Sequence, residues 1–377
     1  MEKIKFNNSC KSTHFNEYIE LLQSDYDLLR QKHFSSLCLA TLSQHYQSAK
    51  LFLTHSATGA LEMIADLMEI KPGDEIILPS YTFVSSANAF VSRGATPVFV
   101  DIDESSMSLT LSSISAAISP NTKAVLLVHY FGHSTNVAEI KQLCKANNLL
   151  FIEDAAMGYG SSFESQPLGV FGDFGVVSFD VTKHISAIQG GLLIVNNDFY
   201  SKRATHLYHN GTNREEFQDG NVPYYEWVDI GSKYQMNELN AAFLWSQLQV
   251  QDELFAHRKK CSLSYYEALL PLQEAGHIQL MEKQFVANNI HGFYIVLATH
   301  AQREELRTYL LSNGIEALFH YIPLHLSKKA IELTGAIRLS TTEKIADTLL
   351  RLPFHDLITA KEIKIISSFI HSFFNEK

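Results

Sequence analysis

Short apolar runs alternate with amphipathic segments along the chain from residue 50 onward. The runs are continuous and rich in β-branched residues, which is typical of strands buried on both faces of a sheet. They cover residues 74–80, 96–102, 123–130, 148–155, 175–180 and 191–197. Between them, residues 58–69 and 137–148 place their apolar side chains on one helical face. This alternation predicts an α/β fold with a mostly parallel central sheet and helices on both faces.

The pattern changes near residue 235. Residues 235–270 contain neither glycine nor proline and predict one long helical stretch, straight or bent. The next patterned segments, residues 293–298, 303–314 and 315–322, predict a strand, a helix and a strand. We therefore expect three parts: an N-terminal arm with a first helix (1–30), a large α/β domain (31–249) and a small α+β domain (250–377).

Composition narrows the class of protein. The chain has 377 residues, of which 46% are hydrophobic and 19% charged, enough for a sizeable core. The net charge is −10 and no basic stripe stands out, which argues against a nucleic-acid partner. A pocket on an acidic protein can still be locally positive and bind small anions.

Neither metal ligands nor export signals stand out. The four cysteines, Cys10, Cys38, Cys144 and Cys261, are far apart and have no zinc-like spacing, so we expect no metal and no disulfide framework. The first residues have no apolar signal core, and no run approaches the roughly 18 residues of a membrane span. We expect a cytoplasmic location and no membrane partner.

Two loops at the ends of strands carry candidate chemistry, because open α/β sheets bind ligands there. In residues 55–63, Ala57, Thr58 and their neighbours lead directly into a helix, so they either offer backbone N–H groups and a hydroxyl to a phosphate or form an ordinary cap. Asp154 ends an apolar strand. Its carboxylate either pairs with a protonated pyridine nitrogen or caps the next turn.

A third candidate is Lys183, which stands between two apolar strands. Ser178 precedes it by five residues, and Gly190 and Gly191 follow it. Taken alone, a loop lysine is usually solvated. Here it follows a candidate phosphate loop and comes about 30 residues after a strand-end aspartate, the order that a pyridoxal phosphate enzyme needs.

Together these stretches resemble the nucleotide-sugar aminotransferases of the DegT/DnrJ/StrS-like family, a branch of the fold type I pyridoxal phosphate enzymes. The likeness covers nearly the whole chain. It rests on the motifs HSATGALEM, KPGDEIILPSYTFVSSANAF, GATPVFVDID, VHYFG, IEDAAMGYGS, GDFGVVSFDVTK, GGLLIVNND, HNGTNREEF and FHYIPLH. Residues 210–234 resemble the subgroup that acts on dTDP-4-keto-6-deoxyhexoses and forms TDP-fucosamine or TDP-viosamine.

The resemblance implies a reaction. An amino group passes from L-glutamate, which leaves as 2-oxoglutarate, to a keto sugar nucleotide, and the product serves surface polysaccharide such as the O-antigen of lipopolysaccharide. Amination at C3 and at C4, and axial and equatorial products, are all compatible with these residues.

The resemblance also implies roles in cofactor binding. Lys183 is the Schiff-base lysine and moves the proton, and Asp154 pairs with the pyridine nitrogen. Phe83 stacks on the cofactor ring or, alternatively, is a core aromatic. Met157 stands beside the ring, where relatives commonly have Gln or His. Three residues hold the phosphate: Ala57, Thr58 and Ser178.

Four residues are implied at the substrate. His320 lies near the sugar, unless it is only a domain-interface histidine, and Tyr321 and Gln189 accompany it. Arg214 reaches the diphosphate or a carboxylate, unless it forms a surface salt bridge. Residues 231–236 match a segment that enters the neighbouring subunit's site, which implies a homodimer with shared active sites. There Lys233 would contact the cofactor phosphate of the partner subunit with a full charge.

Several positions depart from the family pattern and keep two alternatives open. Asp180 stands where His is usual, and Ile188 and Gln189 stand where Gly and Glu are usual. One alternative is a pyridoxal phosphate sugar dehydratase, in which a histidine replaces the lysine; His184 directly follows Lys183. The other is a non-catalytic homologue that binds a sugar nucleotide or a partner.

Overall fold

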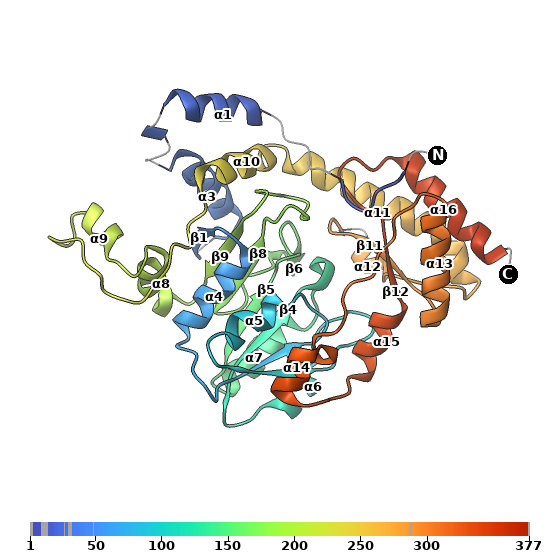
Figure 1. The fold of residues 1–377 in the computed structure, drawn as a ribbon, viewed down its shortest axis with the longest axis horizontal. Helices are drawn as coiled ribbons and strands as arrows, with labels where there is room; N and C mark the ends of the chain where they lie inside the picture. The colour runs from blue at the N-terminus through green and yellow to red at the C-terminus, as the bar shows by residue number, and fades with distance from the viewer. Residues whose placement is uncertain are drawn as a thin grey trace.

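A seven-stranded sheet forms the centre of the larger part of the molecule (Figure 1). The computed structural model describes residues 3–8, 14–25, 27–28, 32–47, 49–286 and 288–375. The order across the sheet is β1 (Lys50–Thr54), β9 (Gly191–Val195), β8 (Phe174–Ser178), β5 (Leu150–Asp154), β4 (Thr122–Val128), β2 (Glu75–Pro79) and β3 (Thr96–Val100). From β8 to β3 all pairs are parallel, whereas β9 is antiparallel to both β1 and β8. The predicted mostly parallel sheet is confirmed; β1, whose apolar run is only three residues long, was not anticipated.

Helices cover both faces of this sheet because its strands are apolar on both sides. Along β2, Ile76 and Leu78 pack into one hydrophobic cluster and Ile77 packs into the other. The first cluster includes α4 (Ala57–Leu67), α5 (Ser85–Val91) and α8 (Ser201–Tyr208). The second includes α3 (His33–His45), α6 (Leu111–Ala117), α7 (Val137–Ala146) and α10 (Glu238–Leu248). Each fully buried aliphatic side chain here contributes about 1.5–3 kcal/mol of transfer free energy.

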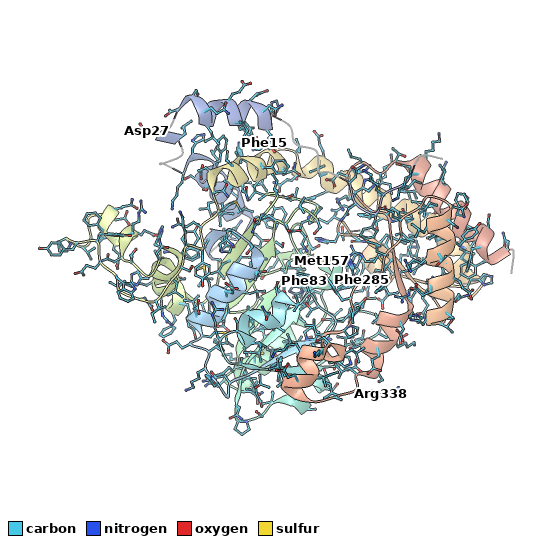
Figure 2. All side chains as sticks on the ribbon, in the orientation of Figure 1. Phe15, Asp27, Phe83, Met157, Phe285 and Arg338 are labelled. Atoms are coloured by element: carbon cyan, nitrogen blue, oxygen red, sulfur yellow. The ribbon has the colours of Figure 1, made fainter. Side chains whose placement is uncertain are left out.

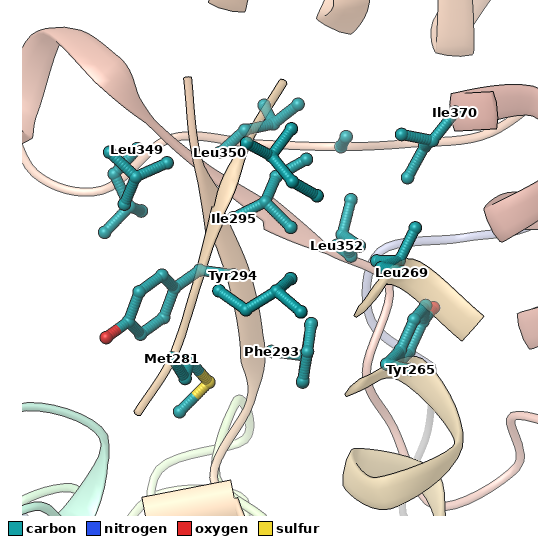
Figure 3. Packing of buried hydrophobic residues seen from close by; sticks show 14 of the residues in the cluster. Tyr265, Leu269, Met281, Phe293, Tyr294, Ile295, Leu349, Leu350, Leu352 and Ile370 are labelled. Atoms are coloured by element: carbon teal, nitrogen blue, oxygen red, sulfur yellow. The ribbon is translucent and has the colours of Figure 1, made fainter. Parts of the chain in front are cut away.

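A three-stranded antiparallel sheet organises the C-terminal part. Its order is β10 (Gln279–Leu280), β11 (Phe293–Val296) and β12 (Leu349–Leu352). The helices around it are α11 (Gln251–Glu274), α12 (Lys283–Val286), α13 (His300–Ser312), α15 (Ser340–Thr348) and α16 (Ala360–Asn375). Helix α14 (Lys328–Thr334) instead packs against β3 of the large sheet. Figure 3 shows Tyr265 and Leu269 of α11 facing the same side of this sheet as Phe293, and the rings of Tyr265 and Phe293 stack at 5.0 Å.

Two expectations about the C-terminal half need correction or refinement. The helical stretch 235–270 is divided, since α10 ends at Leu248 and α11 begins at Gln251, where the expected domain boundary also falls. The strand predicted over 315–322 is wrong: this segment forms only isolated bridges, from Ile315 to Ile4 and from Leu318 to Arg351. It is extended, but beyond Leu318 its backbone is bonded by side chains instead of a neighbouring strand.

The N-terminal segment is divided between the two parts of the molecule. Residues 3–8 lie on the C-terminal part, where the Ile4 N–H donates to the Gly314 carbonyl at 2.8 Å. Helix α1 (Phe15–Ser24) instead lies over α10, and its Phe15 ring meets Phe243 edge-on at 4.9 Å. Residues 1–2, 9–13, 26 and 29–30 of the expected arm, with Cys10, lie outside the described residues. Within the described part, no helix combines the length and apolarity needed to cross a bilayer.

Candidate active site

The carboxyl ends of four strands meet at one edge of the large sheet and form one wall of a cavity. Asp154, the last residue of β5, pairs with Val128 of β4. Thr54 of β1 and Ser178 of β8 both pair with Gly191, because β9 runs antiparallel to both strands. A cavity of about 600 Å³ opens at these strand ends, a volume typical of small-molecule sites.

Ten of the twelve site residues named from the sequence line this cavity. They are Ala57, Thr58, Phe83, Asp154, Met157, Ser178, Lys183, Gln189, His320 and Tyr321. The other two, Arg214 and Lys233, are exposed and do not line it.

The Asp154 carboxylate is buried and held in place at the end of β5. Its Oδ2 accepts a hydrogen bond from the Ser86 hydroxyl at 2.6 Å, and its Oδ1 accepts from the Ala156 N–H at 3.1 Å. Ser86, on α5, also bonds to the Thr82 hydroxyl at 2.8 Å. Both hydroxyls were missed from the sequence, although they stand in the stretch SYTFVSS that was singled out for Phe83. A fixed carboxylate at a cavity edge is suited to accept a hydrogen bond from a protonated ring nitrogen.

Lys183 lies in the loop after β8, partly buried in the cavity wall. Burial lowers the pKa of its amine, Asp154 and Asp180 oppose this shift, and Arg351 adds to it. Asp180 shapes the loop as well, because its carboxylate accepts from the Thr182 N–H at 3.0 Å and its carbonyl from the Lys183 N–H at 2.9 Å. An amine whose pKa is lowered holds more of its reactive, unprotonated form at neutral pH.

The first turn of α4 also lines the cavity. Ser56 is the N-cap, with its Oγ accepting from the Gly59 N–H at 3.0 Å, so the capping interpretation holds for Ser56. Ala57 and Thr58 remain at the positive end of the helix dipole, which favours anions. Gly191 is packed against this turn: a Cβ there would lie 2.4 Å from the Ala57 nitrogen.

Phe83 and Met157 lie close together near the middle of the molecule (Figure 2) and both line the cavity. Phe83 is 58% exposed, so it is not a core aromatic, and its ring lies 6.5 Å from that of Tyr321. Met157 is partly buried against the C-terminal cluster. An open aromatic face and a thioether provide an apolar surface for a planar ring.

Ile188 precedes the cavity residue Gln189 and has a strained backbone. Ile188 has a φ of 67°, in the left-handed region that favours glycine, and it is a β-branched residue. Such a conformation costs roughly 1–2 kcal/mol. The next residue, Gln189, lines the cavity, and its carbonyl accepts from the Asn240 amide at 2.6 Å. This chain thus keeps a glycine-like backbone without glycine where the family pattern has one.

His184, the adjacent candidate for a dehydratase-type residue, does not line the cavity. It is buried, and its Nε2 bonds to the Tyr159 carbonyl at 2.9 Å. Its ring meets that of His291 edge-on at 4.5 Å. This position gives the histidine a packing role and leaves Lys183 facing the cavity.

His129 is a cavity residue that the sequence analysis missed. Its Nε2 donates to the neighbouring Glu153 carboxylate at 2.9 Å. Glu153 also accepts from three backbone N–H groups, of Gly169, Phe171 and Gly172, so this member of the acidic pair is structural. The His129 Nδ1 is buried without a partner in the described part of the chain. It is the second residue of the VHYFG stretch quoted above, but nothing in the sequence marked it as the polar residue that faces the cavity.

Arg214 and Lys233 belong to an exposed arm, defined here as residues 210–235, which includes α9 (Arg214–Gln218) and projects from the large sheet (Figure 1). Burial, then Lys32 and Arg214, lowers the pKa of His209 to about 4, so basic groups gather at the base of the arm. Trp227 is 78% exposed and Ile230 is 80% exposed. Apolar side chains grouped on a projecting arm are typical of a protein interface.

Comparison with known proteins identifies the chemistry of this arrangement. Residues 29–370 match the sequence model of the DegT/DnrJ/EryC1/StrS aminotransferase family. The dTDP-4-dehydro-2,3,6-trideoxy-D-glucose 4-aminotransferase of Saccharopolyspora spinosa is 31% identical over 327 residues, which cover 83% of this chain and 81% of that protein.

Solved structures show the same fold. PseC of Helicobacter pylori, an aminotransferase involved in pseudoaminic acid biosynthesis, has a TM-score of 0.90 at 22% identity and covers 100% of both chains. NtdA of Bacillus subtilis, solved with bound cofactor PMP, has a TM-score of 0.81 at 24% identity over 90% of this chain and 76% of that one. The expected fold type I architecture is confirmed.

Proposed function

Because the chain belongs to the DegT/DnrJ/EryC1/StrS aminotransferase family, we propose that it moves an amino group from L-glutamate to a dTDP-4-keto-6-deoxyhexose. It is an aminotransferase, and its cofactor is pyridoxal phosphate. The dTDP-sugar 4-aminotransferase that is 31% identical supports this acceptor class. The observation that carries the proposal is the gathering of Lys183, Asp154 and the α4 N-terminus around one cavity.

The cavity residues fit this cofactor. Asp154 offers a fixed acceptor for the pyridine nitrogen, and the exposed face of Phe83 offers a surface for the ring. The first turn of α4 and the Ser178 hydroxyl offer donors to a phosphate. Lys183 supplies an amine of lowered pKa.

When bound, pyridoxal phosphate supplies an electron sink for bond changes at the donor and acceptor carbons. Lys183 Nζ accepts the proton from the α-carbon of glutamate, and in the second half-reaction it delivers a proton to the sugar carbon that receives the amine. Asp154 keeps the ring nitrogen hydrogen-bonded throughout, because Ser86 and the Ala156 N–H hold its carboxylate. Phe83, Met157 and Tyr321 would offer the ring an apolar and aromatic surface.

The proposal includes a homodimer with shared active sites. Arg214 and Lys233 do not line the cavity of their own chain, and they lie on an arm with exposed aromatic side chains. In a dimer these two cations would meet the phosphates in the partner's cavity. Sedimentation of the holoprotein tests the dimer, and Trp227→Ser in the arm is expected to weaken it. A stable monomer with full activity would contradict it.

The acceptor is tested by following nitrogen. The holoprotein is incubated with ¹⁵N-labelled L-glutamate and dTDP-4-keto-6-deoxyglucose, and the products are analysed by mass spectrometry and NMR. We expect a ¹⁵N-labelled dTDP-amino-dideoxyhexose with the amine at C4. A UDP-linked keto sugar serves as the matched comparison for the nucleotide. Formation of 2-oxoglutarate without labelled sugar would contradict the acceptor and leave the donor half intact.

A cytoplasmic location and a role in surface polysaccharide synthesis, such as that of the O-antigen, belong to the same proposal. Both rest on the acceptor class. A non-catalytic homologue would bind the sugar nucleotide in this incubation without labelling it.

A further inference from the structure

Arg351, on β12, is a partly buried guanidinium whose partners are unusual. Its charge lies over the rings of Phe6, at 5.1 Å, and Phe131, at 4.8 Å. Its Nη1 donates to the Nδ1 of His320, and its buried Nε has no hydrogen-bond partner among the described residues. Arg351 does not line the cavity, so it acts on the reaction through its contact with His320 and through its charge, which also lowers the pKa of Lys183.

The His320 ring is held on several sides. It stacks on Tyr321 at 5.2 Å and meets Phe6 edge-on at 6.1 Å. The His320 carbonyl accepts from the phenols of Tyr81 and, at 3.3 Å, Tyr130. The ring lines the cavity. These contacts leave the ring little freedom to turn, so each of its two nitrogens keeps a fixed orientation.

The contact with Arg351 determines which nitrogen carries the proton. A guanidinium has only donors and does not lose its proton in proteins. The Nδ1 atom that faces it must therefore present a lone pair. A neutral imidazole with an unprotonated Nδ1 carries its hydrogen on Nε2, and within the described residues Nε2 has no hydrogen-bond partner.

We propose that Arg351 is a positioning residue: it fixes His320 as an uncharged ring whose Nε2–H is available in the cavity to donate to a keto or hydroxyl oxygen of the acceptor sugar. The sugar contact rests on the proposed function, whereas the state of the ring does not. An uncharged His320 ring cannot act as a cationic acid at neutral pH. In this proposal, Lys183 therefore moves the protons.

The charged groups around His320 act in the same direction. Arg351 faces it from β12 and Lys183 from the loop after β8, and the phenols of Tyr81, Tyr130 and Tyr321 complete its surroundings. Burial first, then Arg351 and Lys183, lowers the pKa of His320 to about 4. Asp154, the carboxylate of the cavity, affects Tyr321 and Lys183 but is not among the groups that shift His320.

The ring state is tested by NMR of the holoprotein with ¹⁵N-labelled histidine, using His320→Gln to assign the signal. We expect the pattern of a neutral Nε2–H ring from pH 8 to pH 5. In Arg351→Met the signal should become a mixture of tautomers and titrate closer to the ordinary histidine pKa of about 6.5. Arg351→Lys should keep the parent pattern, because an ammonium also only donates.

Arg303→Met is the matched control. Arg303 is another guanidinium of the C-terminal part that lies over an aromatic ring, Phe319, at 4.4 Å, but its histidine contact is His300. Its loss should leave the His320 signal unchanged. A parent ring protonated at Nδ1, or a His320 signal that is the same in Arg351→Met, would overturn the proposal even if no variant were active.

Half-reaction kinetics test the sugar contact. In Arg351→Met the KM for the keto sugar nucleotide should rise roughly three- to tenfold, as expected for one neutral hydrogen bond, while the glutamate half-reaction stays within about twofold. An unchanged KM together with the altered NMR signal would remove the sugar contact from the proposal. Failure of the parent to accept any keto sugar would instead refute the proposed function, and the NMR result would still decide what Arg351 does to His320.

Discussion

The cofactor half and the substrate half of the cavity are built in different ways. The cofactor half stands on consecutive strand ends of one sheet, and Asp154 is held by the nearby Ala156 N–H and by Ser86 of the covering helix. The substrate half stands on the irregular segment with His320 and Tyr321, which is held by residues far away in the chain, such as Tyr81 and Tyr130. The sheet therefore determines the geometry of the cofactor half, whereas the geometry of the substrate half depends on how the C-terminal part packs against the sheet.

This difference predicts two kinds of variant. Changes in the cofactor half should impair both half-reactions together, because glutamate and the sugar use the same ring. Changes in the substrate half should impair the sugar half-reaction and spare the glutamate half-reaction.

The largest effect is expected for Asp154→Asn. The amide keeps the shape but loses the charge that meets the ring nitrogen, so both half-reactions should slow by about 10³-fold, as for the loss of one preorganised electrostatic contact. Stopped-flow rates with glutamate and with the keto sugar measure this. Asp347→Asn, an exposed carboxylate beside His300, is the control and should be neutral. Slowing of only one half-reaction would contradict the claim that both half-reactions depend on the cofactor half of the cavity.

Gly191→Ala should come next, through the structure of the cofactor half. The new Cβ would lie 2.4 Å from the Ala57 nitrogen and 2.5 Å from the Ser56 carbonyl carbon, and neither main-chain atom can rotate away. We expect a loss of about 2–3 kcal/mol in the free energy of unfolding, as for overpacking, and weaker phosphate binding. In Gly276→Ala the Cβ meets open space, so only the positive φ of 77° is penalised, by about 1 kcal/mol. Equal losses in the two variants, measured by urea unfolding, would show that the close approach has no role.

Ser86→Ala should weaken cofactor binding by roughly tenfold, because a hydrogen bond to a charged acceptor is lost. The Ser86 hydroxyl donates to Asp154 at 2.6 Å. Spectroscopic titration with pyridoxal phosphate gives the dissociation constant. Ser92→Ala, at the other end of the same helix, removes a bond to the Ala89 carbonyl and one from the Arg93 guanidinium, both away from Asp154, and should leave that constant unchanged. An unaltered constant in Ser86→Ala would mean that Ser86 does not hold the carboxylate.

Tyr130→Phe should have the smallest effect and a different signature. It removes the 3.3 Å bond to the His320 carbonyl but leaves that from Tyr81. We expect the KM for the sugar to rise by about two- to threefold, with the glutamate half-reaction unchanged. If glutamate turnover fell by the same factor, the two halves would not be separable in the way proposed here.

The same contrast explains what the sequence predicts. An apolar run that ends in a polar residue can be recognised from a few consecutive residues of the sequence. Asp154, Ser178 and Lys183 are therefore named without a structure. Ser86 and His129 are missed because only the turn of a helix or the end of a strand decides which of several polar neighbours faces the cavity.

The substrate half shows why the rest is not predictable. Residues 315–322 have the apolar composition of a strand, yet distant phenols bond their backbone at His320. Arg351 stands 31 residues from His320, and no periodic pattern links the two. The roles of Arg214 and Lys233 depend on a second chain and stay predictions.

The most direct test of the central claim is an absorbance spectrum of the purified protein supplied with pyridoxal phosphate, before and after L-glutamate, with Lys183→Ala beside it. We predict a visible cofactor band that glutamate bleaches and 2-oxoglutarate restores, and that is altered in Lys183→Ala but not in Lys329→Ala, an exposed lysine paired with Glu332. A parent without such a band, or a band that is the same in Lys183→Ala, would contradict the assignment of Lys183 and, with it, the proposed transfer.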